Sequence, residues 1–93
     1  MTLEAAAETM AAASGFEASD FRRYLAPLVR GTVENWAAHG PRAALTGPIA
    51  RGDETTVQRQ RAAVMAGAPQ LLPLFDALCE STRALATTGE TAP

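Results

Sequence analysis

The residues whose types could do chemistry gather in one stretch of the 93-residue chain, from Ala44 to Val57. This stretch combines two glycines and a proline, which shape backbone turns, with one arginine, two carboxylates and three threonines. The planar guanidinium of Arg51 suits a substrate carboxylate, because it can donate two parallel hydrogen bonds. We therefore consider Arg51 the leading candidate for substrate binding, with the hydroxyls of Thr46, Thr55 and Thr56 beside it.

A purely structural interpretation of the same stretch stays open. Its glycines are spaced as in a phosphate-binding loop, but Asp53 and Glu54 stand where that motif needs lysine and a hydroxyl residue. The two carboxylates would repel a phosphate, and the chain has no GxGxxG dinucleotide fingerprint. In the structural interpretation, Gly47 and Pro48 shape a turn while Asp53 caps a helix and pairs with Arg51. Residue chemistry alone favours this interpretation over substrate binding.

Three single residues elsewhere carry reactive side chains. The amide of Asn35 could donate a hydrogen bond to a carbonyl, although a lone asparagine on a helix more often faces solvent. His39 stands where a helix ends, which favours a capping role over that of a general base. Cys79 is the only cysteine and lies in an apolar repeat. We therefore expect a buried thiol, no internal disulfide and a reducing, cytoplasmic location.

Composition excludes several functional classes. All eight basic residues are arginine, so no lysine is present to form a Schiff base or to bind phosphate. The net charge of −2, without a basic stripe, argues against nucleic acid or a membrane surface as a partner. The chain shows no signal-peptide pattern and no apolar run near the ~20 residues that span a bilayer. We also expect no bound metal.

Alanine dominates the apolar residues, with 21 alanines against 22 larger apolar side chains. Because burial stabilises by about 25 cal/mol per Å² of apolar surface, alanine contributes little to a core. The composition therefore predicts a thin core that a partner subunit or a neighbouring domain must complete.

The spacing of apolar residues predicts an all-α fold, a bundle of four main helices and one short helix in a single domain. We expect this helical domain to span residues 1–87, with a disordered tail over residues 88–93. Pro27 lies inside the second helix and should kink it. Glycine, proline and capping residues place the helices at 3–14, from Ser19 or Asp20 to His39, at 41–45, from the cap Asp53 to Gly67, and from Leu71 to Ala86.

The string from Ala44 to Asp53, followed by Thr56-Val57, resembles the helical C-terminal domain of a family of two-domain Rossmann-type proteins, the domain of unknown function 2520. Proteins of this plan are similar to 6-phosphogluconate dehydrogenase and ketopantoate reductase. The resemblance covers about Phe21 to Ala86. In one departure, this chain has Gln60-Arg61 where family members commonly have histidine-leucine.

The resemblance implies a fold like the C-terminal domain of 6-phosphogluconate dehydrogenase, a homodimer, and an N-terminal NADP-binding Rossmann domain that is absent from this chain. Its threonine-glycine-proline loop would face the cleft between the domains. Some members resemble ketopantoate reductases, which implies an NADP-dependent oxidoreductase acting on a small 2-oxo or 2-hydroxy acid. Asn35 and Thr46 are then the expected catalytic contacts to the substrate carbonyl or hydroxyl. The expected substrate-binding residues are Thr46, Gly47, Pro48, Arg51, Asp53 and Thr56.

A second hypothesis gives the same helical fold no catalytic function. In this hypothesis the chain is a non-catalytic helical dimerisation or interaction module, which the thin, alanine-rich core motivates. Under either hypothesis we expect the chain by itself to bind no cofactor. NADP belongs to the Rossmann domain of the two-domain parent protein.

Overall fold

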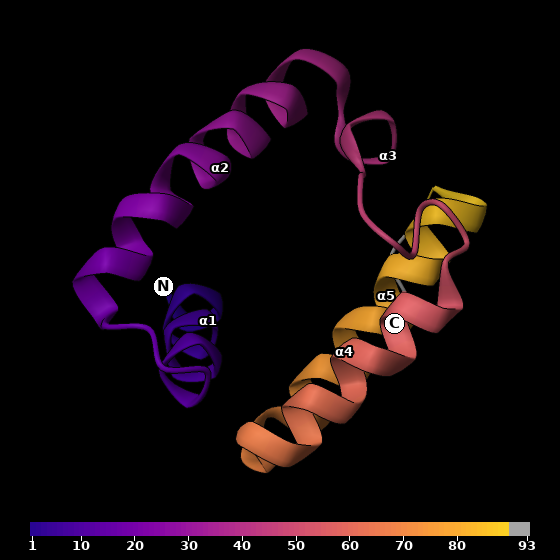
Figure 1. Ribbon diagram of the computed structural model, residues 1–93. Coiled ribbons are helices and arrows are strands. Elements are labelled where there is room, and N and C mark those ends of the chain that lie inside the picture. The colour runs from indigo at the N-terminus through magenta and orange to yellow at the C-terminus, as the bar shows by residue number, and fades with distance from the viewer. Residues whose placement is uncertain (90–93) are drawn as a thin grey trace.

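The chain folds into helices joined by short turns, as its periodicity predicts. The computed structural model describes residues 1–89 and contains no strand within them, so the predicted all-α fold of four main helices and one short helix is confirmed (Figure 1). The helices are α1 (Thr2–Ala13), α2 (Ala18–His39), α3 (Pro41–Ala44), α4 (Glu54–Gly67) and α5 (Leu72–Thr88), with a 3₁₀ turn, η1 (Pro69–Leu71), before α5.

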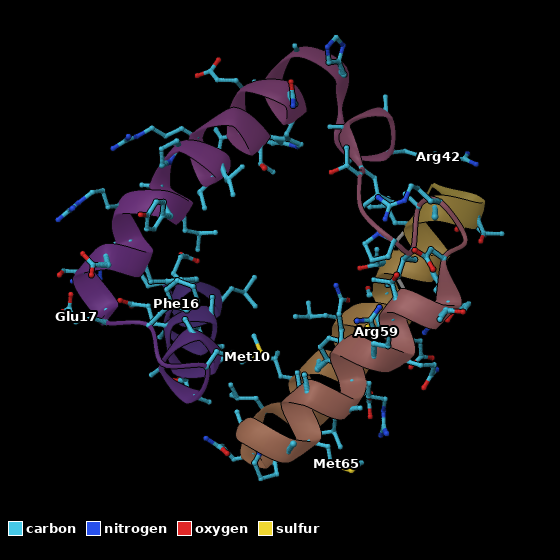
Figure 2. The ribbon with its side chains drawn as sticks, in the orientation of Figure 1. Met10, Phe16, Glu17, Arg42, Arg59 and Met65 are labelled. Atoms are coloured by element: carbon cyan, nitrogen blue, oxygen red, sulfur yellow. The ribbon has the colours of Figure 1, made fainter. Side chains whose placement is uncertain are left out.

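The start of α2 differs from the sequence prediction. The expected caps, Ser19 or Asp20, are wrong: Glu17 is the N-cap, and its carboxylate accepts hydrogen bonds from both of their backbone N–H groups. Glu17 takes this role because its backbone is extended and its side chain folds back over the first turn (Figure 2). Phe16 and Phe21 flank the cap and pack edge to face, with ring centroids 6.4 Å apart.

The end of α5 also differs from the prediction. Thr88 is helical and Gly89, in the left-handed conformation with φ 81°, ends the helix. The predicted end of this helix at Ala86 is therefore two residues early, and Thr88, which was expected to begin the tail, is helical. Residues 90–93 of the expected tail lie outside the described residues. Pro27 lies inside α2, which continues through it as one helix.

Two arginine–carboxylate pairs bind α4 to α5. The Nε and Nη2 groups of Arg61 donate to the two oxygens of Asp76 at 2.8 and 2.9 Å. Those of Arg83 donate to Glu54 at 3.1 and 2.8 Å. Such two-point contacts fix orientation as well as distance, so they set the register of the two helices.

The other helices meet this pair through apolar side chains of α1, such as Leu3 and Met10 near Leu74, and through small or polar groups. At the ends of α1 and α4 the backbones approach so closely that a Cβ added at Gly67 would lie 3.2 Å from the Cβ of Ala13. Near the loop, Arg42 of α3 donates to the carbonyls of Ala86 and Thr87 at the end of α5, at 3.3 and 3.2 Å (Figure 2). A cation at this position satisfies the last carbonyls and complements the helix dipole.

The core is thin, as the composition predicts. Its buried apolar residues are Ala6, Ala11, Val57, Val64, Ala68 and Cys79. No residue of α2 is buried, and Figure 1 shows this helix arching away from α1 toward α3, with the α4–α5 pair across from it. Within residues 1–89, no helix combines the length and the apolar character that crossing a membrane requires.

The two arginine–carboxylate pairs generate a prediction about acid stability. Hydrogen bonds from Arg61 and Arg83 lower the pKa of Asp76 and of Glu54, respectively. A carboxylate with a lowered folded-state pKa stabilises the fold above its unfolded pKa of about 4, and this contribution disappears as the pH falls through the folded value. We expect the Tm to hold between pH 7 and about pH 5 and to fall below that.

The variant Glu54→Gln/Asp76→Asn should lower the Tm at pH 7 and flatten its fall in acid, as measured by circular dichroism. Glu80→Gln is the matched control, because it removes a carboxylate of α5 that belongs to neither pair. Equal acid sensitivity in the double variant and the unmodified chain would contradict the assignment.

Candidate functional site

The loop between α3 and α4 is held in one shape by its own backbone. Arg51 N donates to Gly47 O at 3.2 Å, and Asp53 N donates to Pro48 O at 2.8 Å. Gly47 and Gly52 have φ of 102° and 73°, a conformation that other residues rarely adopt. The two glycines therefore let the chain turn back twice and bring Arg51 next to the start of α4.

Asp53 is the N-cap of α4, as predicted. Its carboxylate accepts from Thr56 N at 3.2 Å and from Thr56 Oγ1 at 2.6 Å. These hydrogen bonds, the hydroxyl's first, hold the pKa of Asp53 below its usual value, with a smaller contribution from the charge of Arg51. Asp53 and Thr56 are thus engaged with each other and fix the end of the loop.

Arg51 is attached only loosely to this cap. Its Nη2 lies 3.8 Å from Oδ2 of Asp53, which is an ion pair too long for a hydrogen bond. The arginine side chain is 63% exposed. The structural and the binding interpretations therefore coexist here, since Asp53 attracts the guanidinium electrostatically and leaves its donors open to solvent.

The remaining predicted site residues do not all lie together. The structure brings Gly47, Pro48, Arg51, Asp53 and Thr56 into one compact turn, with the exposed Thr46 at its beginning. Asn35 lies on the exposed last turns of α2, and α3 separates these turns from the loop along the chain. No hydrogen bond joins Asn35 to residues 46–53. The loop is a surface site, and Asn35 belongs to a different surface.

A cavity of about 540 Å³ between α1 and α4 was not predicted. Met10 and Ala13 line it from α1, Gln60 and Gly67 from α4, and Phe75 from α5. The small residues at the crossing of α1 and α4 were the one signal for it in the sequence. Gln60 is the polar side chain that α4 contributes to the lining, and its neighbour Arg61 is hydrogen-bonded to Asp76. In the described residues, no cluster of histidine, cysteine and acidic side chains could hold a metal ion.

Comparison with known families gives a match over residues 1–82 to the family described as Domain of unknown function (DUF2520). No curated protein and no solved structure matches the chain.

Substitutions in the loop distinguish a structural role from a substrate-binding role. Asp53→Ala removes both acceptor oxygens of the cap, so we expect it to lower the Tm. Asp53→Asn keeps one acceptor oxygen for Thr56 N, so its Tm should stay close to that of the unmodified chain. Arg51→Ala should leave the Tm unchanged because its ion pair is long and exposed. If Arg51→Ala lowers the Tm as much as Asp53→Ala does, Arg51 is a structural residue.

Proposed function

The chain belongs to the DUF2520 family, and from this premise we propose that it is the substrate-binding and dimerisation half of an NADP-dependent oxidoreductase. The substrate would be a small 2-oxo or 2-hydroxy acid. The observation that carries the proposal is the guanidinium of Arg51, which is exposed, lies near Asp53 without a hydrogen bond to it and is mounted on a loop whose backbone is hydrogen-bonded to itself.

Arg51 would bind the carboxylate of the acid. Two parallel N–H···O bonds from one guanidinium fix both the position and the plane of a carboxylate, which a lysine cannot do. The loop backbone matters because it is already ordered, so only the side chain of Arg51 loses conformational entropy when its ligand arrives. Gly47 and Pro48 serve this arrangement through the backbone, and Asp53 with Thr56 serves it by closing the loop onto α4.

The second half of the substrate, its carbonyl or hydroxyl, would be contacted by Thr46 and Asn35. Thr46 is exposed at the start of the loop, so its hydroxyl can donate to an oxygen near Arg51. Asn35 would act from α2, and its role requires that the substrate, or another part of the assembly, bridge α2 and the loop.

The cofactor would reside outside this chain. A dinucleotide needs a glycine-rich turn before a helix, and the sequence has none, so these residues do not fit NADP. The nicotinamide would be held by the N-terminal Rossmann domain of the parent protein, in the cytoplasm, and would supply the hydride. The helical chain would hold the acid in place.

A specific observation also favours the second candidate, a non-catalytic helical interaction module. The exposed apolar side chains of α2, Tyr24, Leu28 and Trp36 among them, form a surface suited to another protein, and this surface requires no chemistry. The two candidates differ in one property, which is the affinity of the loop for a carboxylate.

That affinity is measurable with the chain alone. In ¹⁵N NMR titrations with 2-oxoisovalerate as the probe, we expect saturable shifts confined to the amides of residues 46–53. Arg51→Ala should weaken binding about tenfold or more, since a hydrogen bond to a charged group contributes ~1.5–3 kcal/mol. Arg30→Ala, which removes an exposed arginine from α2, is the matched control and should bind normally.

The outcomes distinguish the candidates. An unchanged loop spectrum at millimolar 2-oxo acid would contradict substrate binding and support the interaction module. Equal binding by Arg51→Ala and the unmodified chain would do the same. Micromolar binding of NADPH by this chain alone would instead contradict the assignment of the cofactor to another domain.

A further inference from the structure

Arg59 is an exposed cation of α4 that has no partner within residues 1–89. It lies in the half of α4 nearer the loop (Figure 2). Its guanidinium makes none of the ion pairs or side-chain hydrogen bonds found in that part of the chain. By contrast, Arg61 is held by Asp76 at 2.8 and 2.9 Å. Arg59 therefore keeps its donors available for a ligand.

Helix geometry places Arg59 near the loop that carries Arg51. Arg59 follows Thr56 by three residues, so the two share one side of α4, and Thr56 Oγ1 donates to the cap Asp53 at 2.6 Å. Arg59 starts about 9 Å along the helix axis from Asp53, at ~1.5 Å per residue. Its side chain leans back toward the loop, as long side chains of a helix do. After the hydrogen bonds from Thr56, the charges of Arg51 and Arg59 also lower the pKa of Asp53.

The charges at the start of α4 do not cancel. The carboxylate of Asp53 lies near two arginines, Arg51 and Arg59. The next carboxylate, Glu54, is bound by Arg83 at 2.8 and 3.1 Å, so it does not neutralise Arg59. Three arginines thus stand against two carboxylates, although the net charge of the whole chain is −2. This local positive charge attracts anions.

A shallow hollow of about 490 Å³ lies along this side of α4. It is lined by Glu54, Thr55, Gln58, Arg59 and Ala62. The hydroxyl of Thr55, the amide of Gln58 and the guanidinium of Arg59 can all donate hydrogen bonds. An anion that extends from Arg51 along α4 would therefore meet further donors.

We propose that the acid bound at Arg51 carries a second carboxylate, and that Arg59 binds it. The substrate is then a 2-oxo or 2-hydroxy dicarboxylic acid. This inference rests on the proposed function, which places the first carboxylate at Arg51. A diacid fits the two arginines because each guanidinium can donate to one carboxylate while a short carbon chain spans the first turns of α4.

The second contact should be worth about fivefold or more in affinity. A hydrogen bond to a charged group contributes more than a neutral one, but Arg59 must give up side-chain freedom to make it. Arg59 is exposed, so water and salt weaken the contact further.

The test compares two acids of equal chain length by ¹⁵N NMR titration of the chain. 2-Oxoglutarate and 2-oxovalerate share the 2-oxo acid end. Their other end is a carboxylate in the first and a methyl group in the second. We expect 2-oxoglutarate to bind about fivefold or more tightly. Both acids should shift the amides of residues 46–53, and only 2-oxoglutarate should also shift those of residues 55–59.

The variant Arg59→Gln should abolish the advantage of 2-oxoglutarate and leave the affinity for 2-oxovalerate unchanged. It removes the second guanidinium and keeps a residue that favours helix. Arg30→Gln is the matched control, because Arg30 is also exposed and has no ion pair within residues 1–89. This control loses the same charge, far from the loop, and should bind both acids like the unmodified chain. Circular dichroism checks that both variants fold.

The outcomes separate this inference from the proposed function. If 2-oxovalerate binding depends on Arg51 but 2-oxoglutarate binds no more tightly, the proposed function stands and the second contact is wrong. Equal losses of 2-oxoglutarate binding in Arg59→Gln and Arg30→Gln would also overturn the second contact, because they would report only the net charge of the chain. If neither acid binds at residues 46–53, both proposals fail.

Discussion

Because alanine is the commonest residue, the helices of this protein can approach closely but bury little. The buried apolar residues found within residues 1–89 are alanine, valine and cysteine. Polar contacts take over much of the positioning: Arg61–Asp76 and Arg83–Glu54 align α4 with α5, and Arg42 holds α3 against the end of α5. These contacts lie at the surface, where each contributes modestly to stability, so they define geometry more than they supply folding free energy.

That division explains why the loop is held by hydrogen bonds while no residue of α2 is buried. The loop lies between α3 and α4, each of which is fastened to α5, and Asp53 closes it. α2 has α1 beside its start and only the short α3 at its end. A thin core explains the exposure of α2, because the chain has too few large apolar side chains to pack against every helix.

Local signals in the sequence were sufficient for the helices and for part of the site. Apolar spacing and the glycine and proline stops predicted the elements, and Asp53 was predicted as a cap because aspartate commonly caps helices. Glu17 was missed because the capping preference ranks serine and aspartate higher and does not weigh the extended backbone before α2. The contacts between elements were not predictable: Arg61 and Asp76 are 15 residues apart, and Arg42 and Thr87 are 45 apart. No local period encodes such separations.

The position of Asn35 separates the two contacts that the proposed substrate needs. Asn35 lies on the exposed second half of α2, whereas Arg51 lies on the loop before α4. An amide in water contributes little to holding a carbonyl, because water competes for the same hydrogen bond, whereas the same amide at a partly covered surface contributes more. A role of Asn35 toward substrate therefore requires that another part of the assembly cover this half of α2. The carboxylate contact at Arg51 has no such requirement, because two charge-assisted hydrogen bonds to a carboxylate are stronger than one from a neutral amide.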